Sequence, residues 1–188
     1  MRQVQRFLTD STEPFQKLDV QLPHQEIWPE MWALRALAVV KQEPHSEGWS
    51  KLCLHGHGLY ELRSYLDYTG AMAGFDRRYR WSDEIRDQIP HTMRFFERFR
   101  PFDHLRRIRL QWLAPGGYIR AHRDVDHGTE RRITVNIAVN NPEGCEMRFG
   151  DRVVPFQAGD AYVLDTTQEH SVHNDSDQHR AHLVLDGA

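Results

Sequence analysis

The 188-residue sequence contains only two cysteines, Cys53 and Cys145. They are too few for a disulfide scaffold or for a zinc site built from cysteine alone, so reduced thiols are expected. Long apolar runs are also missing, because the longest, from Trp32 to Val40, is interrupted by Arg35 and is too short to span a bilayer. The first ten residues, MRQVQRFLTD, lack the apolar centre of a signal peptide. These absences argue against membrane, secreted and fibrous classes, and we expect a cytoplasmic protein.

Lysine is scarce, and the arginines are concentrated in one region. The formal net charge is −3, which argues against a general nucleic-acid binder. Lysine occurs at only three positions, whereas 14 arginines accompany 8 acidic residues between Arg77 and Arg132. Arginine binds carboxylate and phosphate groups through two parallel hydrogen bonds. We therefore expect most of these arginines on a salt-bridged surface and one or two facing an anionic ligand.

The chain length predicts one domain, residues 1–188, whose two parts differ in expected secondary structure. Residues 1–105 mix helical and extended patterns, and we expect them to supply supporting helices, strands and substrate-side loops. The specific expectations are a strand over 15–22, a helix over 27–40 opened by Pro29, a strand over 49–54, a turn over 55–58 and a helix that begins at Pro90.

Residues 106–188 alternate between short strands and turns. Strands are expected over 107–113, 118–124, 132–139, 145–149, 152–156 and 161–164, near residue 170, and over 180–185. A turn at Pro115-Gly116-Gly117 would separate the first two. So many short strands with regular turn signals favour a sandwich, a barrel or a jelly roll. The expected fold class is α+β, mainly β.

Two His-x-Asp tripeptides occur among the twelve histidines. His122 and Asp124 lie at the end of a predicted strand, where a period of two places both side chains on one face. His170 begins another predicted strand, and a jelly roll can bring the two strands together. Two imidazoles and one carboxylate form the facial triad of non-haem Fe(II) oxygenases, which leaves metal positions open for a cosubstrate and dioxygen. The other tripeptide, His173-Asn174-Asp175, is expected in a polar loop.

Arg180 lies on the opposite strand face from Leu183 and Leu185. If the leucines pack outward against helices, Arg180 points into the barrel, where a buried arginine needs an anion. A dicarboxylate cosubstrate would supply one, with its 2-oxo acid end on iron and its other carboxylate on the guanidinium. The ordinary alternative is that the two histidines and the aspartate of the predicted triad are unrelated polar residues of an antiparallel sheet.

The segment 113–124, LAPGGYIRAHRD, resembles the entry to the metal site in the aspartyl/asparaginyl β-hydroxylase family. Residues 158–174 resemble the second metal segment of that family, and the whole resemblance covers residues 107–186. It implies a double-stranded β-helix (jelly-roll, cupin-like) core that binds Fe(II) and 2-oxoglutarate. It also implies hydroxylation of an unactivated C–H bond, with succinate and CO₂ as coproducts. Animal members lack the carboxylate ligand, so Asp124 makes the chain more similar to the bacterial L-proline and amino-acid hydroxylases.

The resemblance also implies roles for individual residues. It makes His122, Asp124 and His170 the metal ligands and the catalytic centre. It implies that Arg180 and Arg132 bind 2-oxoglutarate. Substrate contacts are expected from Arg109, Trp49, His55 and Trp81, with a structural salt bridge as the alternative for Arg109 and ordinary packing as the alternative for the rest.

The expected substrate is an amino acid, or an amino-acid residue in a peptide or a natural-product intermediate, and dioxygen is the other partner. Neither a membrane nor a nucleic acid is expected, and the sequence does not predict an oligomeric state. Three alternatives remain open. They are a cupin-type metal enzyme that does not use 2-oxoglutarate, a non-catalytic jelly-roll binding module, and a nucleic-acid demethylase of the same superfamily, which the arginine-rich middle would suit.

Overall fold

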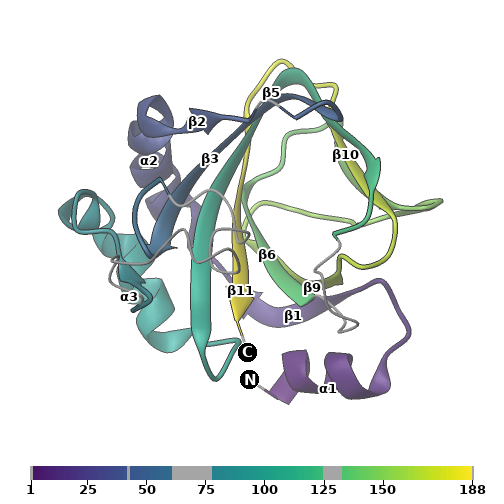
Figure 1. The fold of residues 1–188 in the computed structure, drawn as a ribbon, viewed down its shortest axis with the longest axis horizontal. Coiled ribbons are helices and arrows are strands. Elements are labelled where there is room, and N and C mark those ends of the chain that lie inside the picture. Colours follow the sequence, from purple (N-terminus) through teal and green to yellow (C-terminus); the bar gives the residue numbers. More distant parts are fainter. Residues whose placement is uncertain (1, 42, 61–77, 125–132, 188) are drawn as a thin grey trace.

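The computed structural model describes residues 2–41, 43–60, 78–124 and 133–187. In these residues an eleven-stranded sheet curls on itself, and the helices pack on its outside (Figure 1). The mainly β fold class is confirmed. None of the described helices has the length and apolar character needed to cross a membrane.

The helices and short elements come mainly from the first half of the chain. In chain order these elements are α1 (Arg2–Asp10), β1 (Phe15–Gln21), α2 (His24–Leu34), η1 (Arg35–Leu37), β2 (Val39–Val40), β3 (Ser46–Gly56), β4 (Arg80–Trp81), η3 (Arg86–Gln88) and α3 (Pro90–Arg98). Pro90 is the first residue of α3, as predicted, because the first turn of a helix needs no donor there.

The second half forms most of the sheet. Its strands are β5 (Leu105–His122), β6 (Ile133–Asn140), β7 (Cys145–Phe149), β8 (Arg152–Val153), β9 (Asp160–Asp165), β10 (His170–Asn174) and β11 (Arg180–Gly187). The strand order is β1-β9-β6-β11-β5-β10-β7-β8, and β3 pairs with β5 as well as with β2 and β4. The pairs are antiparallel, and β7 with β8 forms the predicted hairpin.

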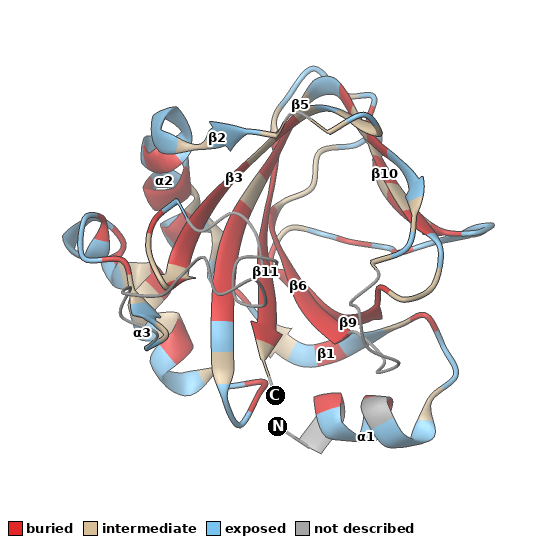
Figure 2. Cartoon of the chain, viewed as in Figure 1, coloured by how far each residue is buried: buried red, intermediate tan, exposed pale blue. Residues whose placement is uncertain are grey.

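Two separate apolar clusters lie on the two faces of the curled sheet. The outer cluster joins α2 and α3 to one face of β11, which contributes Leu183 and Leu185. The inner cluster lies within the barrel and includes Leu113, Met147 and Val172. Figure 2 shows this burial concentrated in the strands. Because successive strand residues face opposite sides, the outward leucines of β11 turn Arg180 toward the interior, as predicted.

The predicted turn at residues 115–117 is wrong, because β5 runs through it. Gly116 adopts a left-handed backbone (φ +69°), and a Cβ on Gly117 would lie 2.8 Å from the Ala114 carbonyl oxygen. These glycines bend the strand without ending it. The first part of β5 thus pairs with β11 and the second part with β10.

Three other local predictions need correction. The second helix begins at His24, and Pro29 lies inside it, because Ile27, Met31 and Leu34 bury a stripe at helical spacing. That helix ends well before residue 40, since residues 39–40 pair with β3. The turn expected at 55–58 starts later, because residues 55–56 still belong to β3 and pair with β4. His173 belongs to β10 and not to a loop.

Candidate metal centre

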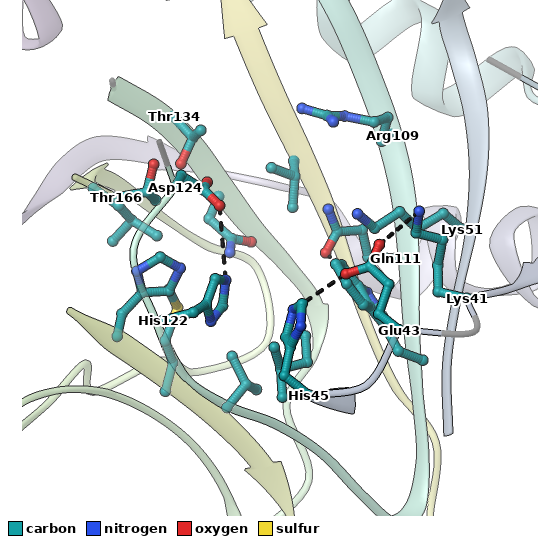
Figure 3. A pocket seen from close by; sticks show the side chains of 18 of the residues that line it. Lys41, Glu43, His45, Lys51, Arg109, Gln111, His122, Asp124, Thr134 and Thr166 are labelled. Atoms are coloured by element: carbon teal, nitrogen blue, oxygen red, sulfur yellow. Dashed lines mark hydrogen bonds and ion pairs between the residues drawn. The ribbon is translucent and has the colours of Figure 1, made fainter. Parts of the chain in front are cut away.

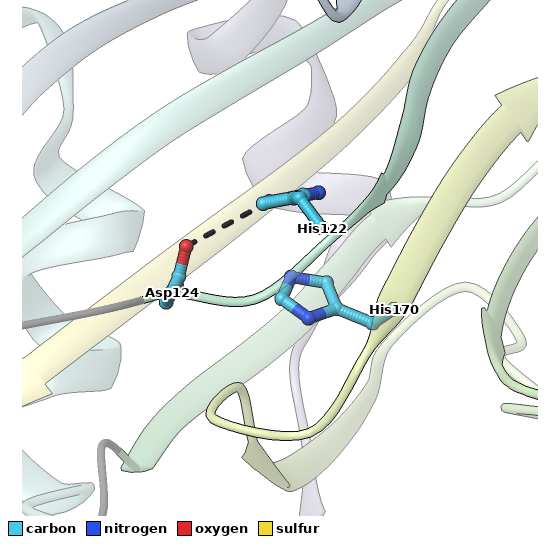
Figure 4. Close-up of side chains that lie close together, drawn as sticks. All are labelled: His122, Asp124 and His170. Carbon is cyan, nitrogen blue, oxygen red and sulfur yellow. Dashed lines mark ion pairs between the residues drawn. The ribbon is translucent and has the colours of Figure 1, made fainter.

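His122, Asp124 and His170 come together at one end of the barrel interior. One possible ligand atom from each lies within 4.8 Å of the others (Figure 4). His122 ends β5 and His170 begins β10, and the two are register partners across this antiparallel pair. The His122 Nε2 atom lies 3.7 Å from Asp124 Oδ1, and the two imidazole centroids are 4.3 Å apart. The predicted parity therefore places three metal-binding groups on one side of the sheet.

Hydrogen bonds fix the same tautomer on both imidazoles. The Nδ1–H of His122 donates to the carbonyl oxygen of Arg120 at 2.8 Å, and the Nδ1–H of His170 donates to that of Gln168 at 2.9 Å. Each ring is thereby left with its Nε2 lone pair for the centre. This is the arrangement of metal-binding histidines, whose second ring nitrogen is oriented by a backbone carbonyl or carboxylate.

The turn between β9 and β10 fixes the position of Asp124. The backbone N–H of Asp124 donates to the carbonyl oxygen of Thr166 at 2.9 Å. Asp165, which is buried, accepts hydrogen bonds from Thr167 and from the Gln168 side chain. The same turn therefore supports Asp124 directly, and supports His170 through the Gln168 carbonyl. The three groups are positioned by one continuous scaffold.

The triad opens onto a cavity of about 440 Å³, a volume in the range of small-molecule sites. Its walls come from the inward faces of β3, β5, β6, β10 and β11 (Figure 3). Besides the triad, Arg109 and Arg180, its polar lining comprises Lys41, Glu43, His45, Lys51, Gln111, Arg123, Thr134, Asn136 and Thr166. The candidate metal centre and several charged side chains thus line one cavity.

Arg180 is buried in the cavity wall and touches only neutral groups among the described residues. Its Nε–H donates to Asn141 Oδ1 at 3.3 Å, and its Nη2 lies 3.1 Å from His182 Nδ1, which is also 2.8 Å from Asn136 Oδ1. Burial and the Arg180 charge hold the pKa of His182 well below its usual value, so this imidazole is neutral. Burial lowers the pKa of Arg180 to about 10, so the guanidinium stays charged at neutral pH. It is a buried cation in the wall of the cavity.

Arg109 lines the cavity and also pairs with a carboxylate behind it. Its Nη2–H donates to Asp186 Oδ2, and Arg107 shares the same carboxylate through a 3.3 Å contact to Oδ1. Arg109 therefore faces the cavity and is also ion-paired with Asp186, a carboxylate that it shares with Arg107.

The structure brings together most, but not all, of the residues expected in the site. The cavity contains the triad, Arg180, Arg109 and Trp49. His55 and Trp81 do not line it; they pack against each other where β3 pairs with β4. Arg132 lies outside the described residues. The sequence did not predict that Lys51 and Gln111 line the cavity. The signal was present, because Lys51 is two residues from Trp49 and Gln111 is two residues from Arg109, so each shares a strand face with a predicted site residue.

The family model of aspartyl/asparaginyl beta-hydroxylase matches residues 23–188. No curated protein matches the chain.

Solved structures with similar folds share little sequence with this chain. A Pseudomonas putida prolyl-4-hydroxylase superposes with a TM-score of 0.56 at 16% identity, covering 98% of this chain and 95% of that one. A Trichoplax adhaerens prolyl hydroxylase, solved with a hypoxia inducible factor peptide fragment, gives 0.56 at 13% identity over 98% and 86%. The viral collagen prolyl hydroxylase of Paramecium Bursaria Chlorella virus-1, solved with 2-oxoglutarate, gives 0.51 at 16% identity over 93% and 95%. At these identities the likeness concerns the fold.

Proposed function

Because the chain belongs to the aspartyl/asparaginyl β-hydroxylase family, we propose that it is an Fe(II)- and 2-oxoglutarate-dependent dioxygenase. The reaction would hydroxylate an unactivated C–H bond of an amino acid, or of an amino-acid residue in a peptide or natural-product intermediate. One atom of dioxygen enters the new hydroxyl group and the other enters succinate, as 2-oxoglutarate loses CO₂. The convergence of His122, Asp124 and His170 at the cavity is the observation that carries this proposal.

The donor set fits Fe(II). Two imidazole nitrogens and one carboxylate oxygen are the ligands of the non-haem iron facial triad. Each imidazole keeps its Nε2 lone pair for a metal because its Nδ1–H donates to a backbone carbonyl. His170 is nearly fully buried, whereas His122 and Asp124 are partly exposed on the cavity side. Iron bound here would supply the activation of dioxygen, and the protein would supply orientation and a dry enclosure.

The chain's own residues would select and orient the cosubstrate. Arg180 offers a planar pair of donors to a carboxylate, and the neutral contacts with Asn141 and His182 fix the plane of its guanidinium. Among the described residues no carboxylate pairs with it, so a bound dicarboxylate would compensate its charge. Arg132 remains a second proposed contact for the same molecule.

Succinate formation tests the proposal. The protein is incubated in air with Fe(II), 2-oxoglutarate and a panel of L-amino acids, and succinate is measured. We expect succinate that requires both iron and 2-oxoglutarate and that rises with at least one amino acid. The Asp124→Ala variant should produce none above background, because a metal ligand is lost.

The same assay separates the alternatives. A substrate that is converted with iron but without 2-oxoglutarate would point to a cupin-type enzyme. If the folded protein does not bind iron, the metal-dependent enzyme is excluded and the non-catalytic binding module is favoured. Full activity of Asp124→Ala would contradict the assigned centre.

A further inference from the structure

Lys51 is a buried lysine in the cavity wall with no part in the proposed metal centre. It lies on β3, is only 7% exposed and shares the inward strand face with Trp49. Its Nζ lies 3.5 Å from the centroid of the Trp49 ring. Lysine is almost never buried to this degree without a partner, because burial removes the ammonium group from water. The Trp49 ring compensates only part of that cost.

The other cations at this end of the cavity already have partners. Lys41 Nζ lies 2.7 Å from Glu43 Oε1, and Arg109 pairs with Asp186. Across the described residues no carboxylate oxygen lies within 4.0 Å of Lys51 Nζ, although Glu43 and Asp124 act on it from farther away. Burial, followed by the Arg109 and Lys41 charges, holds the pKa of Lys51 well below its ordinary value. Among the described residues Lys41 and Arg109 each contact a carboxylate and Lys51 does not, so an anion at this point would compensate the Lys51 charge.

Gln111 provides a second donor beside Lys51. The two residues are register partners across the antiparallel β3–β5 pair, so their side chains are neighbours on the same face. The Trp49 indole N–H donates to Gln111 Oε1 at 3.3 Å. Because an indole N–H can only donate, this contact fixes the amide orientation and leaves the Gln111 NH₂ group for a ligand. An ammonium group and an amide NH₂ side by side match the two oxygens of one carboxylate.

This pair of donors is separate from Arg180. Strand β5 lies between β3 and β11, so the backbones carrying Lys51 and Arg180 are two strand spacings, or about 10 Å, apart. Figure 3 shows Lys51, Lys41 and Gln111 across the cavity from His122 and Asp124. The proposed function assigns the cosubstrate carboxylate to Arg180. Lys51 and Gln111 are then available to bind a different molecule.

Resting on the proposed function, we propose that Lys51 and Gln111 bind a carboxylate of the substrate. The substrate class is then a carboxylic acid, in the simplest case an amino acid with a free α-carboxylate, and not a residue inside a peptide chain. The carboxylate would anchor the molecule on the β3–β5 wall and direct the rest of it toward the metal centre.

The test compares amino acids with their α-carboxamides. Dissociation constants are measured anaerobically on the protein loaded with Fe(II) and 2-oxoglutarate, for a panel of L-amino acids and the matching amides. The variants are Lys51→Met, which keeps the side-chain length without the charge, and Lys51→Arg, which keeps the charge. Lys17→Met is the matched control, since Lys17 pairs with Asp160 on β1 and β9 and does not line the cavity.

We expect at least one acid to bind more tightly than its amide in the wild-type protein. Lys51→Met should weaken that acid about 10- to 100-fold, the range for a hydrogen bond to a charged group, and leave the amide unchanged. Lys51→Arg should retain most of the preference, and Lys17→Met all of it. Because methionine removes a buried charge, Lys51→Met is expected to fold. The dissociation constant of 2-oxoglutarate should change less than about threefold in each variant.

Three results would overturn the inference. The first is a panel in which no acid binds more tightly than its amide. The second is an equal loss for acid and amide in Lys51→Met, which would indicate a structural role. The third is a loss of 2-oxoglutarate affinity in that variant, which would place Lys51 at the cosubstrate. If the wild-type protein itself fails to bind 2-oxoglutarate, the proposed function fails, and the acid-to-amide comparison repeated without cosubstrate still tests Lys51.

Discussion

Two copies of one pattern, His122-Arg123-Asp124 and His173-Asn174-Asp175, occupy neighbouring strands and have opposite surroundings. The first faces the cavity, where His170 joins it. In the second, the His173 Nε2 atom lies 3.5 Å from Asp175 Oδ2 and 3.6 Å from Glu146 Oε2, and the Asp175 side chain is 75% exposed. The two tripeptides are thus alike in sequence and in their local His–Asp distance.

Strand parity explains the difference. His170 and His173 are three residues apart on β10, so they point to opposite faces, and only His170 faces His122 across the β5–β10 pair. The burial of alternate residues along β10 follows the same parity. A His-x-Asp pair therefore acquires a possible metal function from the third group on its face, and the tripeptide alone does not confer it.

Removing the carboxylate from each tripeptide should have the largest and most unequal effects. Asp124→Ala should weaken Fe(II) binding by at least about 100-fold because it deletes a metal ligand. Replacing a residue that only hydrogen-bonds to a ligand already lowers metal affinity about 10- to 100-fold. Asp175→Ala should change the affinity less than twofold. Equilibrium binding of Fe(II) under anaerobic conditions measures both. Equal losses in the two variants would contradict the distinction.

A change at Arg180 tests whether the cavity beside His122 and Asp124 binds 2-oxoglutarate, a function that the surface around His173 is not expected to have. Arg180→Lys should raise the apparent KM for 2-oxoglutarate about tenfold, because a point charge replaces a planar pair of donors at a cost of about 1.4 kcal/mol. Arg148→Lys, on the outward side near His173, is the control and should leave that KM unchanged. Steady-state kinetics with varied 2-oxoglutarate measures both. An unaltered KM in Arg180→Lys would make Arg180 a structural residue.

A smaller effect is expected one step behind the centre. Asp165→Ala should weaken Fe(II) binding about tenfold, because the turn that presents the Gln168 carbonyl to His170 loses its side-chain hydrogen bonds. The free energy of unfolding should fall by about 1–3 kcal/mol. Asp151→Ala, in the exposed β7–β8 turn, should alter neither quantity. Metal titration and denaturant unfolding give the two values, and an unchanged metal affinity would show that the turn does not support His170.

The predictable part of the site is the part that depends on local periodicity. Alternation predicts strands over 132–139 and 180–185, close to the observed β6 and β11, and it predicts the inward direction of Arg180; a period of two places His122 beside Asp124. These features need only the chain's own spacing. The pairing of His170 with His122 required a topology as well, and the jelly-roll expectation supplied it.

The unpredicted part depends on contacts between distant segments. Lys51 and Gln111 become neighbours only through the register of β3 on β5, which no local pattern encodes. The glycines at the bend in β5 predict a turn because glycine is common both in turns and in bent strands, and only the pairing of β5 with β10 and β11 distinguishes the two. His55 and Trp81 were grouped with the site on residue type, and pairing with β4 places them elsewhere.

An anaerobic optical titration tests the central claim most directly. Fe(II) and then 2-oxoglutarate are added to the wild-type protein, His170→Ala and His173→Ala, and the charge-transfer band of an iron-chelated 2-oxo acid is recorded. We predict the band in the wild-type protein and in His173→Ala, and its loss in His170→Ala. A band that survives in His170→Ala, or that disappears in His173→Ala, would contradict the assignment of the metal centre to His122, Asp124 and His170.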